Sequence, residues 1–94
     1  PKFSATIDKE NVNANDTIKY TISTTSKEFN KLTLNINHSG FDVSNIQVIS
    51  GLTYRIIKDE NGIMELELTN DTLQAYVGEV VSINFIAKEI LPYI

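Results

Sequence analysis

Cysteine is absent from this 94-residue sequence. The chain can therefore form neither a disulfide nor a thiolate metal site. That absence fits a cytosolic protein or an exported bacterial protein without disulfides, and it argues against a small secreted animal domain, which usually needs such bridges. Tryptophan is also absent and histidine occurs once, at His38. These gaps remove the histidine clusters that hold zinc and the indole platforms that often bind sugars.

Positive charge is scarce as well. The chain has 12 acidic and 8 basic residues, for a formal net charge of −4, and Arg55 is its only arginine. Nucleic-acid phosphates are bound by clustered Lys and Arg, which this sequence does not offer. No apolar run approaches the ~20 residues of a membrane-spanning helix. We therefore expect neither a nucleic-acid partner nor membrane insertion.

What the sequence does contain is alternation of apolar and polar residues with a period of two, which is typical of β-strands. Ile, Thr, Val and Tyr favour strands, while Asn, Ser and Asp favour turns. Stripes with the helical period of 3.6 are missing. The pattern predicts strands over 2–7, 16–25, 31–37, 46–49, 52–58, 63–69 and 79–89, with a short strand or extended connection at 41–43.

About seven short strands separated by turns predict an all-β fold, specifically an immunoglobulin-like antiparallel β-sandwich. The strongest turn signal is Asn61-Gly62, because both residue types accept the positive φ angles of a tight hairpin. Residues 1–90 are expected to form this one module, with 91–94 as a linker or a trimmed end. Because the chain starts at Pro1 without Met, we expect it to be a piece of a longer protein.

The alternation also predicts which side chains form the core. The predicted inward-facing residues are Ile18, Tyr20, Ile22, Leu32, Leu34, Ile36, Met64, Leu66, Leu68, Val81, Ile83, Phe85 and Ala87. Phe3, Ala5 and Ile7 share one face of the first strand. Val80 and Ile86 are expected on the outward face of the last strand. Arg55 and Ile56, beside Tyr54 or Ile57, are expected near another outward face. Such an apolar patch either serves a partner or neighbouring module, or is covered by a terminus or a loop.

Two segments carry a resemblance to known modules. Residues 13–22 read N-A-N-D-T-I-K-Y-T-I, a turn followed by an alternating strand. This resembles the immunoglobulin-like conserved-repeat modules of Gram-positive bacterial surface proteins, with Asn15 where Gly is usual, and Asn tolerates a left-handed backbone. Residues 76–85 resemble the closing strand of the same modules, and cohesin domains close in a similar way. The resemblance implies a module of the bacterial cell envelope.

Candidate chemistry is sparse. His38 lies in the sequence Asn37-His38-Ser39-Gly40, which lacks a nucleophile-elbow pattern, and we interpret it as a solvated turn residue. No catalytic residue is predicted. The loop between the first two expected strands is rich in the oxygen ligands that calcium prefers. Its weak calcium candidates are Asp8, Glu10, Asn13 and Asp16. The alternative is an ordinary loop that uses Asn and Asp for its turns.

The sequence therefore predicts a non-catalytic, extracellular or cell-surface bacterial module without a cofactor. It is expected to act as a spacer or as an adhesive or interaction domain, with a protein or a neighbouring module as its partner. The isolated domain is expected to be monomeric. The alternatives are a cohesin-like protein-recognition domain and an accessory, carbohydrate-binding domain of a secreted enzyme.

Overall fold

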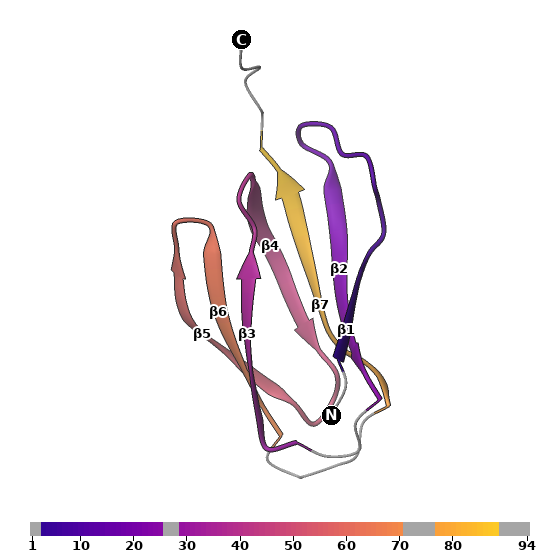
Figure 1. Ribbon diagram of the computed structural model, residues 1–94, viewed down its shortest axis with the longest axis vertical. Helices are drawn as coiled ribbons and strands as arrows, with labels where there is room; N and C mark the ends of the chain where they lie inside the picture. Colours follow the sequence, from indigo (N-terminus) through magenta and orange to yellow (C-terminus); the bar gives the residue numbers. More distant parts are fainter. Residues whose placement is uncertain (1–2, 26–28, 71–76, 89–94) are drawn as a thin grey trace.

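The computed structural model describes residues 3–25, 29–70 and 77–88, and every regular element in them is a β-strand (Figure 1). The strands are β1 (Phe3–Ile7), β2 (Thr17–Thr24), β3 (Lys31–Asn37), β4 (Phe41–Val48), β5 (Thr53–Glu60), β6 (Ile63–Thr69) and β7 (Gly78–Ala87). The described residues contain no helix of the length and apolarity that a bilayer crossing requires. The predicted all-β fold is confirmed.

The strands form two antiparallel sheets that pack into a sandwich. One sheet has the order β1-β2-β7-β4 and the other the order β3-β6-β5. Figure 1 shows the three-stranded sheet on one side of the view and the four-stranded sheet on the other. In a constant-type immunoglobulin domain the fifth strand pairs between the second and fourth, and the seventh pairs with the sixth. Here β7 and β5 exchange those two places, so the architecture is immunoglobulin-like while the strand order differs.

The core lies between the inner faces of the two sheets, centred on β6 and β7. Met64, Leu66 and Leu68 of β6 are completely buried, and Ile83 of β7 is completely buried against them in the same apolar cluster. Phe85 is 4% exposed, whereas Tyr20 and Leu34 are half-buried and pack on the cluster. Each buried aliphatic side chain of this kind contributes about 1.5–3 kcal/mol to folding. The period of two therefore predicted most of the core, and Leu52 and Val80 are the buried apolar residues that it did not place there.

Two β-bulges account for the strands that alternation placed wrongly. β4 is one strand, because Ser44 is an extra residue between Val43 and Asn45 in its pairing with β7. Phe41, Val43, Ile46 and Val48 are thus all opposite inward-facing residues of β7 and are half-buried, despite the irregular spacing.

The second bulge lies between β2 and β7 and corrects the prediction for Val80. Ile22 pairs with Val81 and Ser23 with Glu79, which leaves Val80 as the extra residue. A bulge re-aims the side chain of its extra residue. Val80 is completely buried, so its expected position on the outward face is wrong, whereas Ile86 is 36% exposed as expected for that face.

Both turns that the sequence singled out have the predicted backbone. Asn61 and Gly62 have φ angles of 54° and 77°, so a two-residue turn with positive φ at both positions joins β5 to β6. A Cβ on Gly62 would lie 2.6 Å from the Ser39 hydroxyl oxygen, which adds a steric reason for glycine. Asn15 has a φ of 69°, the left-handed conformation expected from its place in the turn before β2.

Candidate functional site

Three exposed large apolar side chains lie together on β5, where all eight residues are exposed. We define the β5 surface as Tyr54, Arg55, Ile56 and Ile57. Tyr54 is 44%, Ile56 45% and Ile57 42% exposed. The sequence placed Arg55 and Ile56 near an outward face. The structure leaves all four residues exposed, but the outward position is wrong for Ile56, which pairs with the buried Leu66.

The arrangement of β5 at the edge of its sheet explains this exposure. Tyr54 pairs with Leu68 and Ile56 with Leu66, two completely buried residues. Directly opposed residues share a face of the sheet. Tyr54 and Ile56 therefore lie on the core side of their sheet, but the other sheet does not cover them. Ile57 is the extra residue of a bulge in the β5–β6 pairing.

Charged side chains accompany these apolar ones. Arg55 lies 3.5 Å from Glu67 (Nη2 to Oε1), and Lys58 lies 3.5 Å from Glu60 (Nζ to Oε2). Charges and a bulge on an edge strand discourage indiscriminate strand pairing. Tyr and Arg are also enriched in protein interfaces. The β5 surface is therefore suited to contacts through side chains rather than through its backbone edge.

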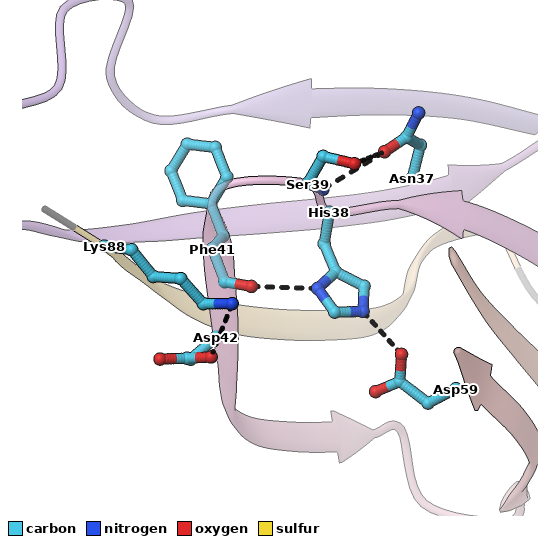
Figure 2. A network of polar contacts seen from close by, with 7 residues as sticks. All are labelled: Asn37, His38, Ser39, Phe41, Asp42, Asp59 and Lys88. Atoms are coloured by element: carbon cyan, nitrogen blue, oxygen red, sulfur yellow. Dashed lines mark hydrogen bonds and ion pairs between the residues drawn. The ribbon is translucent and has the colours of Figure 1, made fainter. Parts of the chain in front are cut away.

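A second candidate site surrounds His38, at the end of the sandwich where β3 turns into β4. Its imidazole Nδ1 donates to the Phe41 carbonyl at 2.9 Å, and Nε2 donates to Asp59 Oδ1 at 2.7 Å (Figure 2). The ring also stacks on Phe85, with centroids 5.8 Å apart and planes inclined by 23°. The side chain is only 11% exposed. The interpretation of His38 as a solvated turn residue is therefore wrong.

These contacts favour the protonated imidazole. Burial by itself lowers the pKa of His38. The hydrogen bonds to the Phe41 carbonyl and to Asp59, together with the negative charge of Asp59, raise this pKa by more than burial lowers it, so the pKa lies above its ordinary value. Phe41 offers only a carbonyl acceptor, and an ionised carboxylate is an acceptor as well, so only the imidazolium donates to both. His38 thus ties the β3–β4 turn to β5, which belongs to the other sheet from β4.

Neighbouring polar contacts fix the same turn. Ser39 donates to the Asn37 side-chain oxygen through both its backbone amide (3.1 Å) and its hydroxyl (2.9 Å). Lys88 and Asp42 form an exposed ion pair at 3.4 Å (Figure 2). Both ring nitrogens of His38 have partners, and the Ser39 hydroxyl donates to Asn37 rather than to the imidazole. These contacts position the turn.

A cavity of about 310 Å³ opens beside His38 between the two sheets. Its walls combine apolar and aromatic side chains with polar and charged ones. The lining residues are Ile7, Val12, Ile18, Tyr20, Ile36, Phe41 and Phe85, together with Lys9, Glu10, Asn35, Asn37 and His38. Pockets that hold small ligands span about 300–1,000 Å³, so this one is at the lower limit of that range.

The four predicted calcium candidates are not gathered around one point by the contacts of the structure. Asp8 Oδ1 accepts a hydrogen bond from the Lys19 amide at 2.8 Å, and Asp16 Oδ2 accepts one from the Asn13 amide at 3.0 Å. Glu10 is exposed and lines the cavity. Within residues 3–25, 29–70 and 77–88, no group of three or more His, Asp or Glu residues is placed to hold a metal ion. Calcium binding at these residues stays a prediction.

Comparison with known proteins adds no identification at this point. The chain matches no protein-family model, no curated protein and no solved structure. The candidate function therefore depends on the surfaces described above.

Proposed function

We propose that this chain is a non-catalytic immunoglobulin-like module of a bacterial cell-surface or secreted protein, serving as a spacer and interaction domain that binds a protein partner. The observation that carries the proposal is the β5 surface. Tyr54, Ile56 and Ile57 are each more than 40% exposed on one strand, beside the exposed Arg55. An edge that combines aliphatic, aromatic and guanidinium side chains has the composition of a protein interface.

A carbohydrate-binding accessory domain is the alternative, and it is supported by one residue. Tyr54 is 44% exposed and could stack on a sugar ring, whereas Tyr20 is half-buried with its ring 6.3 Å from that of Phe85. Its neighbour on the same face of the strand, Ile56, is aliphatic and provides no hydrogen-bonding group to fix a sugar. A protein partner is therefore favoured over a carbohydrate.

The proposal is tested by capture of surface proteins from the source organism on the immobilised chain. We expect the wild-type chain to retain a defined partner, and the double variant Tyr54→Ser/Ile56→Ser to lose at least about 90% of it, because interface anchors of this size contribute about 2 kcal/mol or more. Both residues are half-exposed, so the variant should keep its fold.

Ile63→Ser is the matched control. Ile63 is 49% exposed, but it follows the β5–β6 turn and lies on the opposite face of the sheet from Tyr54 and Ile56. This control should retain the partner like the wild type. Equal retention by the double variant, or retention of polysaccharide instead of protein, would contradict the proposal.

A further inference from the structure

Among the strands of the described residues, four lie at sheet edges, and β3 is the one that shows neither a bulge nor a run of charged residues. β1, β4 and β5 are the other edges. β5 has a bulge and four charged residues, β4 has a bulge, and β1 is only five residues long. β3 has seven residues, pairs with β6 without a register shift, and has no charged side chain after Lys31. Long, regular and uncharged edges are the ones that accept another strand.

At the β3 edge, the three-stranded sheet has one strand fewer than the four-stranded sheet that it packs against. Ala5 and Ile7 of β1 pair with Ile22 and Tyr20 and so share the core-side face. Ile22 is 3% exposed, whereas Ile7 is 54% exposed. The inner face of β1 is thus left uncovered at its end, at Ile7.

Two contacts place β1 and β3 on either side of one seam. The Phe3 ring at the start of β1 lies 6.0 Å from the ring of Phe29, two residues before β3, in an edge-to-face arrangement. At the other end of both strands, Ile7 and Ile36 line the cavity beside His38. The seam between the two sheets therefore runs along β3 and ends in the cavity beside His38.

We propose that this seam binds one extended peptide segment of a protein partner by strand addition to β3. The backbone of the segment would pair with the free edge of β3, and an apolar side chain would fill the cavity. In strand addition, backbone hydrogen bonds supply affinity and pockets for alternate side chains supply specificity. The added strand would cover Ile7 and complete a sandwich with four strands in each sheet.

The features of the seam define this occupant. A cavity of about 310 Å³ has room for a leucine or phenylalanine side chain, since a cavity left by removal of one leucine side chain measures about 150 Å³. The space that faces β1 has room for one added strand. A second copy of this chain could not supply its β3 alone, because its own four-stranded sheet would come with it. The alternation of Thr33, Leu34 and Asn35 along β3 calls for a partner segment that alternates apolar and uncharged polar residues in the same way.

The test uses the whole chain, labelled for amide NMR, and a short synthetic peptide in which valine and threonine alternate, with leucine at its centre and lysine at both ends. We expect the amide signals of β3 to shift on titration and to exchange more slowly with deuterium, while those of β5 do not change. A peptide with glycine at its centre should bind about tenfold more weakly or worse, because it leaves the pocket unfilled.

Two controls separate strand addition from nonspecific apolar contact. N-methylation of alternate peptide amides removes the backbone donors of one edge and should abolish binding without any change in the protein. Ile7→Asp should weaken binding by about tenfold or more, whereas Ile63→Asp should not, although both residues are about half exposed (54% and 49%).

Several results would overturn the proposal. These are unchanged β3 signals at millimolar peptide, equal binding of the N-methylated peptide, or a chain that already dimerises through β3. Because the seam and the β5 surface share no residue, partner capture that depends on Tyr54 and Ile56 can succeed while this titration fails, and the reverse also holds.

Discussion

His38 shows how one side chain joins elements that are far apart in the sequence. Its ring nitrogens reach the Phe41 carbonyl and the Asp59 carboxylate, which is 21 residues away, and its face lies against Phe85. Hydrogen bonds with one ionised partner contribute about 1.5–3 kcal/mol to stability. The protonated ring should therefore stabilise the end of the sandwich beside the cavity.

This contact predicts a pH dependence of folding. A histidine whose pKa is raised in the folded state contributes stability that is fully present below its ordinary pKa of about 6.5 and is lost as the pH rises through the raised value. We expect the free energy of unfolding of the wild type, relative to His38→Gln, to fall by about 1 kcal/mol across this range, because water partly screens the ion pair.

Denaturant titrations at a series of pH values measure this difference. Asp59→Asn is the matched control, since it keeps a side-chain oxygen as acceptor and removes the charge. The free energy of unfolding of Asp59→Asn should therefore depend less on pH than that of the wild type, as is also expected for His38→Gln. A wild type that gains stability over His38→Gln with rising pH would have the opposite sign and would contradict the assigned contacts.

Residue-level prediction succeeded where the cause is local. Asn15, Asn61 and Gly62 were assigned to turns because of their own tolerance of positive φ, and each has that conformation. His38 was missed because its environment depends on Asp59 and Phe85, which only the tertiary fold brings close. Its spacing from Asp59 in the sequence provides no signal of the pair.

At the scale of elements, regular strands were predicted well and irregular ones were not. The bounds of β3 and β6 are those expected, and neither strand contains a bulge in their shared pairing. β4 was read as two pieces and Val80 as an outward residue, because a bulge adds one residue and reverses the alternation after it. Period-two patterns cannot show such a shift unless the pairing partner is known.

The bulge in β7 predicts that alanine substitutions at Val80 and at Ile86 have different effects on stability. Val80→Ala should lower the free energy of unfolding by about 2 kcal/mol, because it removes fully buried methyl groups. Ile86→Ala, at a position that is 36% exposed, should lower it by less than about 1 kcal/mol. Chemical denaturation measures both. An equal or larger loss for Ile86→Ala would mean that the two residues are not arranged as the bulge requires.

At the scale of the whole molecule, the two sheets are unequal, and their free edges are the surfaces on which both proposals depend. The four-stranded sheet extends past the three-stranded one at β1, and β5 leaves Tyr54 and Ile56 uncovered at the other edge. The sequence predicted the class of fold and exposure near Ile56. It could not predict the strand order or the seam, because these follow from pairings between distant segments.

The central claim is that β6 and β7 form the paired interior while β3 and β5 each keep one edge free, and amide hydrogen exchange of the intact chain tests it most directly. Because interior strands open only with the whole domain, amides of β6 and β7 should exchange slowest. In β3 and β5, slow amides that donate to β6 should alternate with fast ones at the free edge. Uninterrupted protection along β3 or β5, or exchange of β6 and β7 as fast as the loops, would contradict this architecture.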